Sequence, residues 1–159
     1  MKKLLTLCIV YQPPKVLLAM KKRGFGEGRW NGYGGKVKEN ETIFDAMKRE
    51  VLEEANIVVS DAFLSGIIEY QFKDSQDILV VYIFCAKSFE GIPKETEEMK
   101  PQWFKENAIP YHEMWNSDRE WIPLFLQGKK FQGTFLYDSS ESHNILNHTL
   151  TIVENINYE

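Results

Sequence analysis

The stretch GKVKENETIFDAMKREVLEEANI spans residues 35–57 and contains the clearest helical pattern in the chain. Thr42 followed three residues later by Asp45 is typical of a helix start, and the pattern predicts a helix over residues 43–55. At about 100° per residue, one arc of this helix is apolar, which predicts a buried stripe made of Phe44, Met47, Val51 and Ala55.

Three glutamates lie on the arc next to this stripe, namely Glu50, Glu53 and Glu54, and Arg49 lies one turn from Glu53. A glutamate-rich helix face is usually solvated, with Arg49 and Glu53 forming an ordinary surface ion pair. However, Glu50 lies at spacings from the other two glutamates at which like charges repel. Clustered carboxylates beside an apolar stripe also indicate a site for a hard divalent cation, which prefers oxygen ligands. The helix alone leaves both interpretations open.

The spacing upstream of the helix favours the second interpretation. From Gly35 the chain follows, in register, the pattern G-x5-E-x7-R-E-U-x-E-E-x-G-U, where U is apolar, except that Asn56 replaces the last glycine. This pattern is the Nudix box, and the chain resembles the Nudix hydrolase superfamily. Asparagine is the most tolerant residue after glycine of a left-handed backbone, so we expect Asn56 to end the helix at a small cost in stability.

The resemblance implies an α/β fold, the Nudix α/β/α sandwich with a mixed β-sheet. It also implies hydrolysis of a nucleoside diphosphate linked to another group, with Mg²⁺ or Mn²⁺ as the cofactor. By the same resemblance, metal binding and activation of the attacking water fall to Glu50, Glu53 and Glu54, with Glu54 or a glutamate near it acting on the water. Arg49 would hold these glutamates in place.

Two glycines precede the box helix. Gly34 and Gly35 would allow metal or phosphate to approach the backbone closely, and Gly34 could offer its carbonyl to the metal. Glu98, in the loop KETEEMKP, would add a metal or water contact by resemblance, although a plain polar loop is the alternative.

Nearly the whole chain resembles a group of animal Nudix enzymes that hydrolyse oxidised purine nucleoside triphosphates, such as 8-oxo-dGTP, to the monophosphate and pyrophosphate and so sanitise the nucleotide pool. The similar segments cover residues 17–37, 84–104 and 113–133. By that resemblance, the base pocket would be lined by Thr6, Phe25, Asn31, Tyr70, Phe72, Leu79, Trp115, Asp118 and Trp121. Lys21 and Lys36 would lie near phosphate.

The residue types agree with purine binding. A purine needs an aromatic face and a few polar groups at its edge, and Trp115 and Trp121 flank the polar residues Asn116, Ser117 and Asp118. Asn31 offers a donor and an acceptor together. Each has a simpler alternative, which is core packing for the tryptophans, a turn for Asn31 and a solvated strand end for Lys21.

One position departs from the animal pattern, which has two adjacent aspartates where this chain has Ser117-Asp118. Two neighbouring carboxylates raise each other's pKa, so that one can stay protonated and donate a hydrogen bond. That coupling is absent with Ser117, although its hydroxyl can donate or accept. We therefore expect narrower or altered base selectivity.

The rest of the chain adds strands around this helix. Alternating or continuous apolar runs predict strands over residues 4–11 and 16–22, joined by a QPPK turn, and further strands near 67–72, 78–87, 131–137 and 148–154. A short second helix is expected over residues 119–127. We interpret residues 1–159 as a single α/β domain.

Composition limits the partners. The formal net charge of −4 argues against binding to nucleic-acid polymers, and no apolar run reaches the ~20 residues that span a membrane. Cys8 and Cys85 lie in apolar runs without metal-ligand spacing, which indicates buried thiols and a cytoplasmic protein. We expect a monomer whose partner is its nucleotide substrate.

Two other functions remain open from the sequence. The chain could be a Nudix hydrolase for another nucleotide, such as an unmodified or methylated purine triphosphate or ADP-ribose. It could also be a catalytically silent domain that binds nucleotides or a protein. The three retained glutamates argue against the silent domain, because mutually repelling carboxylates have no evident structural use.

Overall fold

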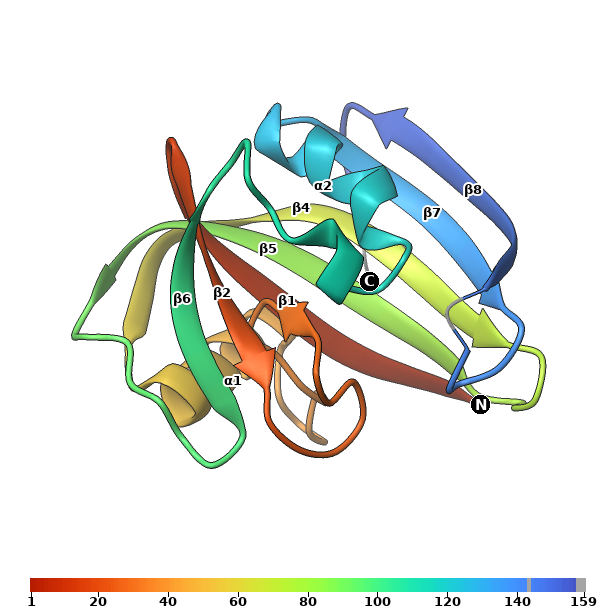
Figure 1. The fold of residues 1–159 in the computed structure, drawn as a ribbon, viewed down its shortest axis with the longest axis horizontal. Helices are drawn as coiled ribbons and strands as arrows, with labels where there is room; N and C mark the ends of the chain where they lie inside the picture. Colours follow the sequence, from red (N-terminus) through yellow and green to blue (C-terminus); the bar gives the residue numbers. More distant parts are fainter. Residues whose placement is uncertain (143, 157–159) are drawn as a thin grey trace.

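The computed structural model describes residues 1–142 and 144–156, and it is built around one eight-stranded sheet (Figure 1). The strands are β1 (Lys2–Gln12), β2 (Lys15–Lys21), β3 (Trp30–Asn31), β4 (Val58–Phe72), β5 (Ile78–Glu90), β6 (Met99–Lys105), β7 (Lys130–Tyr137) and β8 (Ile145–Val153). The helices are α1 (Ile43–Ala55), α2 (Asp118–Leu126) and a 3₁₀ turn, η1 (Tyr111–Glu113).

The sheet is mixed, as predicted. Its strand order is β3-β2-β1-β5-β4-β7-β8, and β6 pairs with β2 outside this path. β1 runs parallel to β5 and β4 runs parallel to β7, whereas the other pairs are antiparallel. The predicted QPPK turn connects β1 and β2, whose last pair is Gln12 with Lys15.

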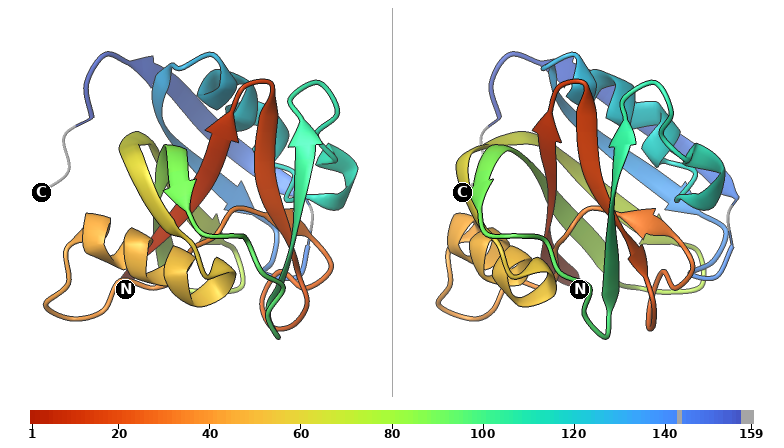
Figure 2. Two further views of the ribbon diagram at one scale, coloured as in Figure 1. Left: turned by 90° about the vertical axis from the view of Figure 1, so that its left-hand side faces the viewer. Right: turned by 60° about the vertical axis from the view of Figure 1, so that its left-hand side comes forward.

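Alternate residues of the central strands bury opposite faces of the sheet. On one face, Cys8 and Val10 of β1 pack with Met47 and Val51 of α1, while on the other face Ile9 shares a cluster with α2. Figure 2 shows the two helices on opposite sides of the sheet. This is the α/β/α sandwich that the sequence predicts. Among the described helices, none is long and apolar enough to cross a membrane.

Helix α1 has the predicted bounds and both predicted ends. The Thr42 hydroxyl accepts a hydrogen bond from the backbone N–H of Asp45 at 3.0 Å, and Asn56 ends the helix with φ of 58° and ψ of 36°. The predicted stripe is wrong at Phe44, whose side chain is exposed and meets Phe84 edge-on at the margin of the core. Ala46 is buried instead.

Asn56 gives a direct test of the left-handed helix end. Replacing it with Ala is expected to lower the free energy of unfolding by about 1 kcal/mol, because a β-carbon is unfavourable at this φ and alanine lacks asparagine's local hydrogen bonding. Asn56→Gly is expected to match or exceed the wild type. Urea denaturation of the three proteins measures both effects, and an Ala variant as stable as the Gly variant would contradict this account.

Several strands extend beyond their predicted bounds. β4 begins at Val58 rather than near residue 67, because it pairs with β5 from Val58 to Gln71. Its alternation is broken at Asp61, whose φ is positive, and at a register shift between Leu64 and Gly66. β6 begins inside the expected polar loop, where Met99 pairs with Lys21. β3 and η1 have no counterpart in the sequence prediction.

Candidate active site

A cavity of about 610 Å³ lies against the sheet on the face that α2 covers. Strand alternation builds its floor, since the side chains that face it are spaced two apart along β1, β4 and β5: Lys3, Leu5, Leu7, Tyr70, Phe72, Leu79 and Val81. The cavity also reaches Gly34-Gly35 and Glu54, and Glu54 belongs to α1 on the opposite side of the sheet. One space therefore joins the predicted base pocket to the helix that carries the glutamates.

Most of the predicted site residues line this cavity. They are Thr6, Lys21, Phe25, Asn31, Gly34, Gly35, Lys36, Glu54, Tyr70, Phe72, Leu79, Trp115 and Asp118. The predicted residues outside its lining are Arg49, Glu50, Glu53, Glu98, Asn116, Ser117 and Trp121.

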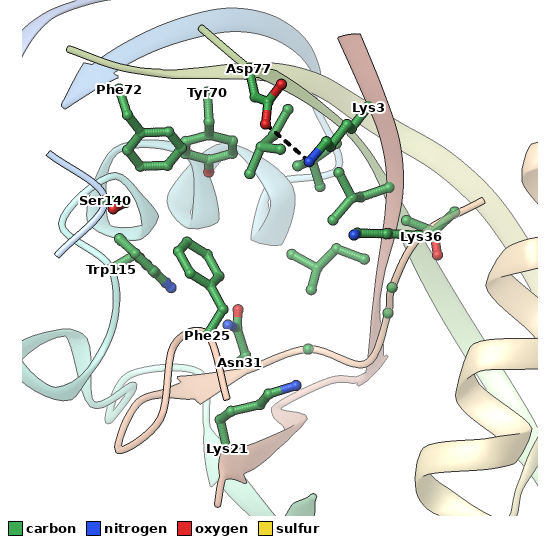
Figure 3. A pocket seen from close by; sticks show the side chains of 18 of the residues that line it. Lys3, Lys21, Phe25, Asn31, Lys36, Tyr70, Phe72, Asp77, Trp115 and Ser140 are labelled. Atoms are coloured by element: carbon green, nitrogen blue, oxygen red, sulfur yellow. Dashed lines mark ion pairs between the residues drawn. The ribbon is translucent and has the colours of Figure 1, made fainter. Parts of the chain in front are cut away.

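Aromatic rings gather on one side of the cavity and amino groups on the other (Figure 3). Phe25 stacks on Trp115 with ring centroids 5.2 Å apart and meets Phe72 edge-on. Its side chain is 58% exposed, and it lies on the glycine-rich loop between Gly24 and Gly26, both of which have positive φ. The amino groups of Lys3, Lys21 and Lys36 lie on the other side, so the cavity offers a stacking surface and a cationic surface together.

Asp118 is a buried carboxyl that lines the cavity. Its side chain accepts a hydrogen bond at Oδ1 from Trp121 Nε1 at 3.0 Å, whereas Oδ2 is buried and has no hydrogen-bond partner among the described residues. Burial raises the pKa of Asp118 to about 7, against the effects of Trp121, Ser117 and the cation of Arg29. A buried oxygen without a partner is costly, so it marks a position where a ligand edge can bind.

Trp121 and Asn116 do not have the predicted contact with the cavity. Trp121 is 1% exposed and stacks on Phe131 in the core. It contacts Asp118 through the hydrogen bond that its Nε1 donates. This follows from α2, which begins at Asp118 and places Trp121 one turn further along the same side. Core packing, the simpler alternative from the sequence, describes Trp121 correctly.

Glu54 is the glutamate of α1 that faces the cavity. Although α1 is a surface helix, this side chain is only 7% exposed, and its Oε1 accepts the backbone N–H of Gly34 at 2.9 Å. Burial, with smaller contributions from the nearby charges of Glu50 and Glu98, raises the pKa of Glu54 to about 7. The Gly34 hydrogen bond and Lys21 act in the opposite direction.

Arg49 connects the remaining carboxylates. It donates to Glu41 through Nε at 2.6 Å, to Glu50 through Nη1 at 2.9 Å and to Glu53 through Nη1 at 3.3 Å. It also donates to the carbonyl of Lys36 at 3.1 Å, which ties the helix to the loop before it. Hydrogen bonding to Arg49 lowers the pKa of Glu41 to about 2. Arg49 therefore has the positioning geometry expected from the resemblance, and Glu41 is its strongest partner.

The carboxylate oxygens of the predicted metal ligands are of the type that a hard divalent cation prefers, but they are not gathered around one position. Within residues 1–142 and 144–156, no three His, Cys, Asp or Glu side chains lie close enough to hold a metal ion. Glu50 and Glu53 are turned toward Arg49, and Glu98 lies 3.8 Å from Lys21. However, a β-carbon at Gly35 would lie 2.6 Å from the Glu50 carboxyl carbon, so only glycine leaves room for this carboxylate beside the cavity. The repulsion that raises the pKa of Glu54 is what a bound cation would relieve.

The structure adds lining residues that the sequence did not indicate. They are Lys3, Leu5, Leu7, Gly32, Asp74, Ser75, Asp77, Val81, Met99 and Ser140. Lys3 and Asp77 form an ion pair of 3.0 Å at the rim, and no local pattern signals it, because it depends on the parallel pairing of β1 with β5. Tyr137, whose hydroxyl accepts the backbone N–H of Ser117, was also missed.

The two raised carboxyl pKa values predict how stability depends on pH. Folded Glu54 and Asp118 retain protons up to about pH 7, whereas in the unfolded chain they lose them near pH 4. The native state therefore binds more protons across this window, so the free energy of unfolding of the metal-free protein is expected to fall as pH rises through it. The lowered pKa of Glu41 makes the free energy of unfolding rise with pH, but only at a pH below this window.

Urea denaturation in the presence of a chelator, from about pH 5 to about pH 8, measures this dependence. Glu54→Gln and Asp118→Asn are each expected to reduce the slope, because an amide does not titrate. A slope that is unchanged in both variants would contradict the raised pKa values.

Comparisons with known proteins agree with this geometry. A NUDIX domain model matches residues 1–125. The chain is 48% identical to the oxidized purine nucleoside triphosphate hydrolase of Mus musculus, covering 96% of each chain, and 47% identical to the Danio rerio protein of that name, covering 97% of each. A solved MutT protein from Bacillus halodurans superposes with a TM-score of 0.82 at 29% identity, covering 93% of this chain and 97% of that one. The chain belongs to the Nudix hydrolase family.

Proposed function

We propose that this Nudix hydrolase cleaves oxidised purine nucleoside triphosphates, such as 8-oxo-dGTP, to the monophosphate and pyrophosphate, and so sanitises the nucleotide pool. The observation that carries the proposal is that one cavity is lined both by aromatic rings with the unpartnered Asp118 Oδ2 and by Glu54 of α1. The names of the two animal relatives support the same substrate class.

The aromatic end would bind the base. The exposed ring of Phe25, which is itself stacked on Trp115, would offer a face for stacking, and the Asp118 carboxyl with the Asn31 amide would read the polar edge of a purine. Lys21 and Lys36 point into the cavity from the other side and would neutralise phosphate oxygens.

Glu54 is the residue that we assign to the attacking water. Because Oε1 is held by Gly34, we assign the proton-accepting role to Oε2. The pKa of Glu54 is raised to about 7 without metal, and a bound cation would lower it, so Glu54 would be ionised and able to accept a proton near neutral pH.

Nudix hydrolases generally use a divalent metal, and for this chain we propose Mg²⁺ or Mn²⁺. Glu50, Glu53 and Glu54 would hold it, together with the Gly34 carbonyl and Glu98. When bound, such a cation neutralises phosphate charge and lowers the pKa of a bound water. Arg49 would position Glu50 and Glu53 near the cavity through its contacts of 2.9 and 3.3 Å with their carboxylates.

We further propose a monomeric, cytoplasmic enzyme of one domain over residues 1–159 that does not bind nucleic-acid polymers. The net charge of −4 supports the last point, and the free, buried thiols of Cys8 and Cys85 are consistent with a reducing compartment.

A turnover screen tests the proposal. The purified protein is incubated with Mg²⁺ or Mn²⁺ and with oxidised, methylated and unmodified nucleoside triphosphates and ADP-ribose, and the products are identified. The expected result is the highest kcat/KM for an oxidised purine triphosphate, with pyrophosphate released and activity lost on chelation. Preference for ADP-ribose, with AMP and ribose phosphate as products, would overturn it.

A further inference from the structure

Lys3 is the third lysine of the cavity, and neither the sequence patterns nor the resemblance assigned it a role. Its amino group lies with those of Lys21 and Lys36 on the side of the cavity away from the aromatic rings (Figure 3). Lys3 Nζ lies 3.0 Å from Asp77 Oδ2, and the two side chains are 38% and 40% exposed. The pair therefore lies at the rim, where a ligand in the cavity can reach it.

Strand pairing brings Lys3 close to Lys36. Leu5 of β1 forms an antiparallel bridge with Lys36, so the side chains of these two residues lie on the same face of the sheet. Lys3 precedes Leu5 by two residues and therefore lies on that face too. Diagonal neighbours of this kind are close enough for two long side chains to contact one ligand.

The segment that carries Lys36 begins at the glutamate of the cavity. The Gly34 N–H donates to Glu54 Oε1 at 2.9 Å, and the next carbonyl, that of Gly35, accepts the Thr6 N–H of β1 at 2.9 Å. From there the segment runs along β1 toward its start, where Lys3 lies. A chain of phosphates with one member beside Glu54 would thus extend along β1 toward the two lysines.

Asp77 neutralises only part of the charge at this place. Its bond with Lys3 lowers its pKa most, and the charge of Lys36 acts in the same direction, so one carboxylate faces two ammonium groups. An exposed ion pair of this kind contributes little to stability. A diphosphate group carries several negative charges and more acceptor oxygens than a carboxylate, so it can replace Asp77 as the partner of Lys3.

We propose that Lys3, together with Lys36, binds the terminal diphosphate of the substrate, the part that leaves as pyrophosphate, and that Asp77 competes with it for the Lys3 ammonium group. The inference rests on the proposed function, because it takes the substrate to be a triphosphate. It makes Lys3 a residue that distinguishes substrates by the number of their phosphates.

The test is binding of inorganic pyrophosphate, measured by calorimetry at low ionic strength and without metal, with inorganic phosphate as the second probe. Lys3→Gln is expected to weaken pyrophosphate binding about tenfold, because one charge-assisted contact is lost. Asp77→Asn is expected to strengthen it about threefold, because the competing carboxylate is removed. A merely structural ion pair would give changes of the same sign in both variants, since each substitution breaks the pair.

A second ion pair provides matched controls. Lys2 and Glu69 lie 3.5 Å apart, and neither lines the cavity. Lys2→Gln and Glu69→Gln remove the same charges as the test variants and are expected to leave pyrophosphate binding unchanged. The double variant Lys3→Gln/Asp77→Asn is expected to bind as weakly as Lys3→Gln, because Asp77 acts through Lys3.

The outcomes separate this inference from the proposed function. Unchanged pyrophosphate binding in both Lys3→Gln and Asp77→Asn would overturn the inference even if the enzyme hydrolyses 8-oxo-dGTP. Equal wild-type affinity for phosphate and pyrophosphate, or no pyrophosphate binding at all, would also overturn it. Opposite changes in the two variants, with unchanged controls, would support it even if the turnover screen selects another triphosphate.

Discussion

Glu54→Gln is expected to lower kcat for the preferred triphosphate by about two to four orders of magnitude, the range that a positioned general base contributes. Glutamine keeps the shape of the side chain, and its amide oxygen can still accept the Gly34 N–H that now binds Oε1 at 2.9 Å. It cannot take a proton from water, and it removes one negative charge from the proposed metal site. The fold is expected to remain intact, because Glu54 is held by a hydrogen bond that glutamine can make.

The measurement is steady-state kinetics with Mg²⁺ at saturating substrate, together with binding of the product monophosphate. Binding is expected to stay close to that of the wild type, since Glu54 belongs to α1 whereas Asp118 begins α2, which lies on the opposite side of the sheet. Glu90→Gln at the exposed end of β5 is a matched control for loss of a carboxylate, with unchanged kinetics expected. A Glu54→Gln enzyme with near wild-type kcat would show that another group activates the water.

The local part of the fold could be predicted from the sequence, because its signals lie within a few residues of each other. Helix α1 has the predicted bounds, and both of its ends follow from Thr42 and Asn56. The burial of Glu54 could not be predicted in this way. It depends on Gly34, which approaches the helix so closely that its N–H reaches the carboxylate.

Contacts between distant segments account for most of what the sequence missed. The first half of β4 is a strand because β5 pairs with it, even though its own alternation is broken at Asp61 and Gly66. Lys3 and Asp77 meet only because β1 and β5 run side by side. Tyr137 was within reach of sequence reasoning, because it follows Phe131 and Phe135 in the buried alternation of β7.

The aromatic and polar run from Trp115 to Trp121 shows how neighbours in sequence separate in space. Trp115 precedes α2 and lines the cavity, whereas Trp121 lies inside the helix and packs into the core. Asp118, at the first position of the helix, connects the two environments through its bond to Trp121. Resemblance to a family assigned all three to one pocket, and only the start of α2 separates their roles.

Asp118→Ala is expected to have the largest effect at the base end of the cavity, lowering kcat/KM for the preferred purine triphosphate by about two to three orders of magnitude. The reason is that a purine edge would then be buried without its partner, and unpaired buried polar groups are the strongest source of discrimination in a binding site. Truncation also frees Trp121 Nε1, which now donates to Oδ1 at 3.0 Å. The loss should therefore appear mainly in KM and in binding of the product monophosphate, with kcat much less affected, in contrast to Glu54→Gln.

Asp118→Asn distinguishes charge from shape in the same site. Its amide oxygen can keep the Trp121 bond, but it presents one fixed donor and one fixed acceptor at every pH. Guanine-type substrates are expected to lose roughly tenfold in kcat/KM, because a neutral hydrogen bond replaces a charge-assisted one, while adenine-type substrates lose little. The ratio of the two kcat/KM values should then no longer depend on pH near 7, where Asp118 titrates in the wild type. Retention of the wild-type pH dependence by the Asn variant would show that a group other than Asp118 reads the base.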